Sequence, residues 1–226
     1  MPLGAGRGGL LYPTAAAAGA ARTEVTVTVY GDAQIDTAQY KFGSASGLFD
    51  GTGDTLITDS TIDMTNGAWT FECFYRPNSQ PATTIIFDPR VTSGYLNRIL
   101  GTRNQKLAYY NGSWQVGTTA MSNGTWYHVA WSYDGSNMRV YLDGTQQISV
   151  TESGTFADTA VAIMGRFDAG AFYSNGHADE IRFSNTARYT SGFTAPTSAF
   201  SNDADTTLLL HCEGADGSTT FSDDYT

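Results

Sequence analysis

The stretch GTWYHVAWSYDGSNMRVYLDGTQ, from Gly124 to Gln146, decides the fold. Apolar and polar residues alternate through it twice, which predicts two strands, because successive side chains of a strand point to opposite faces. Trp131 belongs to one face of the first strand and His128 to the other. An Asp-Gly turn follows at 134–135, where glycine tolerates the positive φ of a tight loop. A second Asp-Gly pair at 143–144 closes the stretch, which therefore predicts two adjacent antiparallel hairpins that serve as scaffold.

The same alternation runs along most of the chain. Residues 23–32, TEVTVTVYGD, alternate strictly and predict a half-buried strand. Further strand candidates are GLFDG, DTLITD, AWTFECFYRP, TTIIFD, NRILGT, KLAYYNGSWQVG, QQISVT, AVAIMGR, HADEIRFS and TTLLLHC. Their spacing of roughly 8 to 12 residues is typical of an all-β sandwich or barrel. The chain has 226 residues, 41% hydrophobic and 13% aromatic, which is enough for one large core, so we expect a single all-β domain over residues 23–226.

The charge balance restricts the partners. The chain carries 12 basic and 22 acidic residues, a net charge of −10. This excess repels phosphate backbones and anionic lipids, and no basic cluster offsets it locally. No run approaches the roughly 20 apolar residues of a membrane-spanning helix. We therefore expect neither a nucleic acid nor a membrane as a partner.

The first 22 residues, MPLGAGRGGLLYPTAAAAGAAR, differ in composition from the rest. They are superficially like a signal peptide, but Arg7 is the only early positive side chain. Glycines at 8 and 9 and Pro13 interrupt what would be a continuous apolar core. We expect a flexible Gly/Ala-rich arm over residues 1–22, which can order against another subunit.

Two cysteines, Cys73 and Cys212, are too few for a disulfide framework. Both lie in apolar runs, which favours buried free thiols, because free cysteine packs as a small hydrophobic residue. A single bridge between them is the alternative that the sequence leaves open.

Four motifs in order carry a family resemblance: GLFDGTGDTLIT, AWTFECFYRP, GTWYHVAWSYDGSNMRVYLDG and GHADEIRFSNTARYTSGFTAPTSAF. Together they resemble the laminin-G-like, concanavalin A-like lectin/glucanase domain family, in the subgroup found in bacteriophage structural and bacterial surface proteins. The resemblance covers Asp32 to His211. It implies a jelly roll of two antiparallel sheets, with about six or seven strands each. It also implies sugar or protein binding at loop rims or on the concave face, sometimes with calcium.

The two ends of the chain resemble a permuted version of such a domain. The C-terminal TTLLLHCEGADGSTTFSDD is similar to the opening strand of the subgroup, and residues 27–51 resemble what usually follows that strand. The strand at 206–212 is expected to complete the sandwich of its own chain, because intramolecular pairing avoids the entropy cost of association. Exchange of this strand with a neighbouring copy is the alternative.

The residues do not predict an enzyme. Glycoside hydrolysis needs two carboxylates that project together into a cleft. Asp179 and Glu180 are adjacent, and adjacent residues of a strand face opposite sides. Glu72 is a lone strand carboxylate. All three histidines lie in strand patterns, and no serine has a nucleophile-elbow motif around it.

Calcium is the metal that the acidic loops favour, since hard cations bind carboxylate and carbonyl oxygens. The alternative is that aspartate in an Asp-Gly pair, such as Asp50 before Gly51, serves turn geometry. No spacing matches an EF-hand loop. The candidate ligands are Asp50, Asp54, Asp168 and Asp179.

Glycan recognition would use aromatic rings that stack on sugars, flanked by polar side chains. The loop aromatics are Tyr95, Trp114 and Tyr173, and the polar neighbours in sequence are Arg98, Asn111 and Asn175.

Two functional hypotheses follow. The first is a non-enzymatic structural and binding module on the surface of a virus particle, a bacteriophage virion, as a capsid decoration or tail-fibre component. Its arm would anchor it to other virion proteins or to copies of itself, as a homo-oligomer, and it would also bind host polysaccharide. The alternative is a secreted, soluble or cell-surface lectin that binds carbohydrate with the assistance of calcium.

Overall fold

The computed structural model describes residues 23–60, 62–65, 67–89, 98–152, 156, 160–165 and 172–225. Within these ranges the chain forms strands, turns and loops, and none of it is a helix that could cross a membrane. The strands are β1 (Val27–Tyr30), β2 (Gln34–Asp36), β3 (Ser46–Asp50), β4 (Thr55–Thr58), β5 (Trp69–Ser79), β6 (Thr83–Asp88), β7 (Ile99–Arg103), β8 (Lys106–Tyr110), β9 (Trp114–Ala120), β10 (Tyr127–Tyr133), β11 (Asn137–Leu142), β12 (Thr145–Thr151), β13 (Ala162–Ile163), β14 (Asn175–Ser184) and β15 (Thr206–Leu210).

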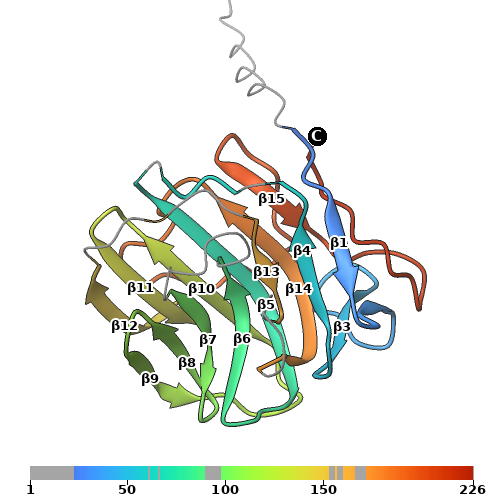
Figure 1. The fold of residues 1–226 in the computed structure, drawn as a ribbon, viewed down its shortest axis with the longest axis horizontal. Coiled ribbons are helices and arrows are strands. Elements are labelled where there is room, and N and C mark those ends of the chain that lie inside the picture. Colours follow the sequence, from blue (N-terminus) through green and yellow to red (C-terminus); the bar gives the residue numbers. More distant parts are fainter. Residues whose placement is uncertain are drawn as a thin grey trace, which may run out of the picture.

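Two antiparallel sheets pack against each other (Figure 1). The seven-stranded sheet has the order β1-β4-β13-β6-β7-β8-β9. The eight-stranded sheet has the order β12-β11-β10-β5-β14-β3-β2, with β15 paired to β14. The inward side chains of both sheets share one large hydrophobic core. This arrangement confirms the predicted all-β, concanavalin A-like jelly-roll sandwich.

The stretch that predicted two hairpins forms β10, β11 and the start of β12, which pair antiparallel in that order. In the first turn, the Asp134 carboxylate accepts hydrogen bonds from two backbone N–H groups of the turn, and Gly135 has φ of 90°. In the second turn, Asp143 and Gly144 both have positive φ, 48° and 77°. Both Asp-Gly pairs therefore serve turn geometry, as the sequence predicted.

Aromatic rings fill the space between the sheets. Trp69 on β5 stacks on Phe183 of the neighbouring β14, with 5.7 Å between ring centroids. Phe71, also on β5, reaches Phe87 of the opposite sheet at 4.5 Å. All four side chains are buried. Ring pairs of this kind contribute about 0.5 to 1.5 kcal/mol each beyond their buried area. The pair of Phe71 and Phe87 joins the two sheets, and the pair of Trp69 and Phe183 joins two neighbouring strands of one sheet.

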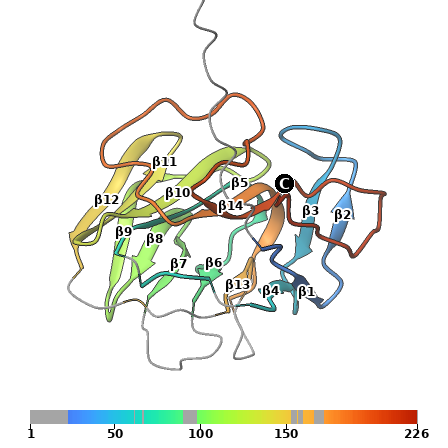
Figure 2. The same ribbon diagram turned by 90° about the horizontal axis from the view of Figure 1, so that it is seen from above.

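A long connection between β14 and β15, residues 185–205, crosses the outer face of the eight-stranded sheet (Figure 2). Its Tyr189 and Phe193 rings stack at 3.6 Å between centroids. The Phe193 ring meets His128 of β10 edge-on at 5.6 Å. His128 is fully buried as a result. Both faces of β10 are thus covered, one by the core and the other by segment 185–205.

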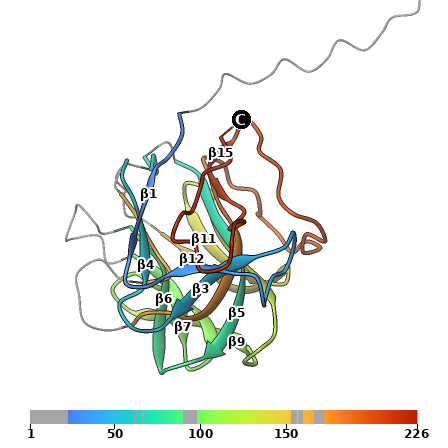
Figure 3. The same cartoon turned by 90° about the vertical axis from the view of Figure 1, so that its right-hand side faces the viewer.

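The C-terminal residues close the sandwich beside its first strand. In this structure β15 pairs with β14 of the same chain. The Asp223 carboxylate then accepts hydrogen bonds from the backbone N–H groups of Val25 and Leu209, both at 2.9 Å. Figure 3 shows the C-terminal end close to the start of β1. Asp223 therefore links the two ends of the described chain.

His211, just after β15, makes stability depend on pH. Its Nδ1 lies 2.8 Å from Glu180 Oε1 and its Nε2 3.2 Å from Asp224 Oδ2. The contact with Glu180, followed by the weaker effect of Asp224, raises the pKa of His211 to about 9. The unfolded value is about 6.5. Because the folded pKa is the higher one, the stabilisation is complete below about pH 6.5 and is lost as the pH rises through about 9.

We expect urea denaturation to show the free energy of unfolding falling by about 1 to 3 kcal/mol between about pH 6.5 and pH 9.5. His211→Gln should remove most of that slope. A slope that persists in His211→Gln would assign the titration to another group.

Candidate functional site

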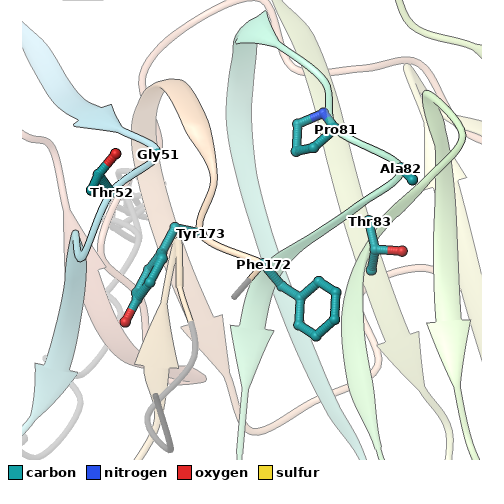
Figure 4. Close-up of a pocket in the computed structure, with 7 residues that line it drawn as sticks. All are labelled: Gly51, Thr52, Pro81, Ala82, Thr83, Phe172 and Tyr173. Carbon is teal, nitrogen blue, oxygen red and sulfur yellow. The ribbon is translucent and has the colours of Figure 1, made fainter. Parts of the chain in front are cut away.

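A hollow of about 560 Å³ opens where three segments converge (Figure 4). They are the loop after β3, the connection between β5 and β6, and the residues just before β14. They meet because Asn175, the first residue of β14, lies opposite both Asp50 of β3 and Ser79 of β5. Ligand pockets commonly measure roughly 300 to 1,000 Å³, so the hollow has the size of a binding site. It is lined by Gly51, Thr52, Pro81, Ala82, Thr83, Phe172 and Tyr173.

Phe172 presents an apolar ring to solvent from a strained backbone. Its side chain is 41% exposed, and its φ is 83°. A bulky residue in this region costs on the order of 1 to 3 kcal/mol and persists only where its surroundings hold it. Here the Phe172 carbonyl accepts a hydrogen bond from Ile85 N at 2.8 Å. The sequence did not single out Phe172, although it stands next to the predicted Tyr173.

Tyr173 occupies the other side of the hollow, and its ring lies beside Thr52 in Figure 4. A Cβ atom at Gly165 would lie 3.0 Å from Tyr173 Cδ1 and 2.5 Å from the Asp54 carbonyl oxygen. Glycine at 165 therefore leaves room for this ring. The next residue, Ser174, donates its hydroxyl to the Ile85 carbonyl at 2.8 Å, which holds the segment against β6.

Asn175 holds the loop that forms one wall of the hollow. Its Nδ2 donates to the Asp50 carbonyl oxygen at 2.5 Å. Gly51 has φ of 89°, and a Cβ atom there would lie 2.9 Å from Asn175 Cβ. The predicted glycan residues Tyr173 and Asn175 thus come together here, with Asn175 as a positioning residue.

The same loop, residues 50–54, carries an acidic cluster. Asp32, Asp50 and Asp54 each offer an oxygen atom, and these atoms lie within 4.8 Å of one another. The buried Asp54 carboxylate accepts hydrogen bonds from Asp32 N at 2.9 Å and Asp50 N at 2.7 Å. Burial raises the pKa of Asp54, because the charged form loses its hydration. The oxygen donors suit a hard cation such as calcium, so the cluster could hold a metal ion.

Sequence reasoning named Asp50 and Asp54 but missed Asp32. Strand pairing explains its position, because Tyr30 at the end of β1 lies opposite Thr55 at the start of β4. Asp32 then follows β1 by two residues and meets Asp54. The Gly-Asp turn signal at the end of the alternating strand was visible in the sequence. No local pattern showed that this turn would meet the loop of residues 50–54.

Asp179 lies apart from this cluster. It is fully buried, and its Oδ2 accepts hydrogen bonds from the N–H groups of Lys41 at 2.8 Å and Phe42 at 3.0 Å. Burial raises the pKa of Asp179 to about 7. Two further predicted residues, Tyr95 and Asp168, lie outside the described residues.

Arg98 and Asn111 gather around another acid. Arg98 Nη2 lies 2.6 Å from Glu152 Oε1, and Asn111 Nδ2 donates to Glu152 Oε2 at 3.4 Å. Tyr109 donates its hydroxyl to the same Oε2 at 2.7 Å. This group is at the opposite end of β7 from Arg103, which pairs with the hollow's Thr83. These two predicted residues therefore do not line the hollow.

The carboxylates considered for catalysis are held by structural contacts. Burial alone would raise the pKa of Glu72, but its hydrogen bond with His128 and the charge of Arg182 outweigh burial and leave that pKa below its usual range. A register shift interrupts β14 between Asp179 and Arg182, so strand alternation does not apply there. Glu180 instead accepts a hydrogen bond from Phe200 N at 2.7 Å. Cys73 and Cys212 are buried free thiols.

The fold and the loop-rim hollow define a lectin-like β-sandwich. Residues 50–191 match the family model described as the Concanavalin A-like lectin/glucanases superfamily. The chain belongs to this superfamily, as the motif resemblance predicted. The sequence has no match among curated proteins.

Solved structures with the same fold are distant in sequence. A Bacteroides ovatus protein, provisionally described as carbohydrate binding, is 15% identical, with a TM-score of 0.53 over 83% of this chain and 51% of its own. The Trypanosoma rangeli sialidase in complex with the inhibitor DANA is 15% identical, with a TM-score of 0.56 over 73% of this chain and 28% of its own. The receptor binding domain of botulinum neurotoxin type G is 8% identical, with a TM-score of 0.52 over 73% of this chain and 44% of its own. The chain thus spans about half of the first protein, 51%, and less of the other two.

Proposed function

We propose that this protein is a non-enzymatic carbohydrate-binding module that holds a glycan in the hollow between Phe172 and Tyr173. The observation that carries the proposal is the Phe172 ring, 41% exposed on a backbone with φ of 83°. Backbone strain of this kind clusters at functional sites. An aromatic face beside polar groups suits a sugar ring, and the hydroxyls of Thr52 and Thr83 flank the two rings. Membership of the lectin/glucanase superfamily and the description of the Bacteroides ovatus protein support a sugar ligand.

Calcium is the proposed accessory ion. Asp32, Asp50 and Asp54 would hold it, and it would offset the mutual repulsion of their carboxylates. Because residues 50–54 also form a wall of the hollow, the ion would brace the binding loop rather than take part in chemistry.

The proposed setting is the surface of a bacteriophage particle, with other virion proteins or copies of this chain as partners. The sequence resemblance to that subgroup and the Gly/Ala-rich composition of residues 1–22 support this setting. A soluble or cell-surface lectin is the alternative, and it would use the same hollow.

Phe172→Ala is expected to lower the affinity for a glycan ligand about 10-fold or more, which corresponds to about 1.4 kcal/mol of lost stacking. A glycan array on the purified protein, with calcium and with a chelator, identifies the ligand, and titration calorimetry compares the variants. Phe172→Gly should lose the same affinity and raise the melting temperature, because glycine adopts positive φ without strain.

The matched control is Tyr40→Ala, which removes a 50% exposed ring from the loop between β2 and β3. It should leave the affinity unchanged. Equal affinity of wild type and Phe172→Ala would contradict the proposed site. Binding that survives the chelator would keep the glycan and remove calcium from the proposal.

A further inference from the structure

Two cations stand out in this acidic chain. Four other arginines each face a carboxylate at close range: Arg98 with Glu152, Arg139 with Asp134, Arg182 with Glu72, and Arg188 with Asp203. Four described cations have no ion-pair partner among the described residues: Lys41, Arg76, Arg103 and Lys106. Arg76 donates to Asn78 Oδ1, and Lys41 lies over the Phe74 ring. Arg103 and Lys106 differ from these two because they lie together on one hairpin. The chain carries a net charge of −10, so carboxylates are abundant, yet none neutralises this pair in the described structure.

Arg103 and Lys106 lie directly opposite each other at the β7–β8 hairpin. The two turn residues between them, Asn104 and Gln105, have φ of 51° and 67°, as in a type I′ turn. Like charges directly opposite each other weaken a strand pair. An anion bound across both side chains would relieve this repulsion.

The pair lies next to the hollow. Thr83, which lines the hollow, pairs with Arg103 across β6 and β7. The neighbouring Thr84 and Thr102 are buried and their hydroxyl oxygens are 2.6 Å apart, so they point inward. Alternation then directs Thr83, Arg103 and Lys106 outward. With strands about 4.8 Å apart, the hollow and the two cations follow one another across the outer face of the seven-stranded sheet.

An aromatic pair extends this surface. The Arg103 Cζ lies 5.3 Å from the centroid of the Trp114 ring, and Trp114 packs against Tyr110 at 5.1 Å. Trp114 is partly exposed, and Val116 next to it is 41% exposed. An indole beside a guanidinium suits a sugar ring that bears a carboxylate. The ring can stack on the aromatic face, and the carboxylate can accept guanidinium N–H groups.

We propose that the ligand is an anionic polysaccharide of carboxylated sugars, which runs from the hollow across Arg103 and Lys106 to Trp114. This inference rests on the proposed glycan-binding function and names the substrate class of that site. Charge complementarity selects the carboxylated polymer over a neutral glycan, because the two cations lack any other anion among the described residues. The aromatic rings select a sugar over an acidic peptide.

The test compares carboxylated oligosaccharides with their own methyl esters, which keep the sugar backbone and remove the charge. Oligogalacturonate, alginate oligomers and oligosialic acid serve as probes in titration calorimetry at low and high salt. Wild type should bind at least one acid about 10-fold more tightly than its ester, and this preference should shrink in high salt, which screens the charges. Arg103→Gln should remove the preference while leaving the affinity for the ester within about two-fold. It should not lower the melting temperature, because it relieves a repulsion.

Lys41→Gln is the matched control, since it removes one positive charge that lies over Phe74 of the other sheet. It should leave the preference intact.

Three results would overturn the inference: equal affinity for acid and ester, an Arg103→Gln loss that affects acid and ester alike, or equally tight binding of polyglutamate. If esters or neutral glycans bind without any preference and Phe172→Ala abolishes that binding, the proposed hollow stands and the anionic class fails. If no glycan of either kind binds, both fail.

Discussion

Glu72→Ala is expected to lower the free energy of unfolding by about 3 to 5 kcal/mol, the usual cost of removing one partner from a buried ion pair. The Glu72 carboxylate is fully buried and accepts hydrogen bonds from Arg182 Nη2 at 2.6 Å and from the Tyr189 hydroxyl at 2.7 Å. Its Oε2 also lies 3.0 Å from His128 Nε2. Without it, Arg182 would keep its charge beneath segment 185–205 with no anion. Urea denaturation near pH 7 measures the loss.

Two variants separate the charge from the packing. Replacing both Glu72 and Arg182 with leucine should recover part of the loss, because a buried pair can be exchanged for apolar groups at little net cost. Glu24→Ala, at an exposed position, should stay within about 0.5 kcal/mol of wild type. A loss below about 1 kcal/mol for Glu72→Ala would mean that water replaces the carboxylate and that segment 185–205 does not seal this face.

Trp131→Ala is also expected to cost about 3 to 5 kcal/mol, because truncating a buried aromatic removes its transfer energy and leaves a cavity. The indole is fully buried on β10, and its ring lies 6.1 Å from that of Phe71 on the neighbouring β5. Thermal unfolding followed by circular dichroism should show a marked drop in melting temperature or an unfolded chain. Trp131→Phe should cost less, because it keeps most of the ring volume.

Trp114→Ala is the control for that experiment, since Trp114 is a partly exposed tryptophan on the outer face of the seven-stranded sheet. It should change the melting temperature only slightly. Should Trp131→Ala melt like wild type, its indole would not contribute to the core as its burial indicates.

Local sequence patterns predicted most of the strands and the two Asp-Gly turns, but not the short β2 or the division of residues 106–117 between β8 and β9. The two Asp-Gly pairs and the alternation between them define β10 and β11, since glycine supplies positive φ and alternation marks the two faces. The pattern did not reveal that both faces of β10 are buried. That burial depends on segment 185–205, whose Tyr189 and Phe193 rings cover His128 from a distant part of the sequence.

The candidate site was predictable only where its residues are close in sequence. Asp50 and Asp54 share one loop, and Tyr173 and Asn175 share one segment, so each pair could be named from the sequence. Asp32 joins them through the pairing of β1 with β4. Phe172 was missed because nothing in its residue type indicates a φ of 83°.

Other predicted residues were separated by the fold. The sequence placed Arg98 and Asn111 beside loop aromatics, but both side chains bind Glu152, which directly follows β12. Their partner is more than 40 positions away along the chain, at separations of 54 and 41. No local pattern encodes such a contact.

The sequence by itself determined most of the strands, the Asp-Gly turns and the superfamily, because alternation and Asp-Gly chemistry act between near neighbours. The tertiary structure alone decided which loops meet: residues 50–54 with Phe172 and Tyr173 at the hollow, and Thr83 with Arg103 beside it. The physical reason is strand register, which is set by packing of the whole core and brings together residues that no local interaction connects.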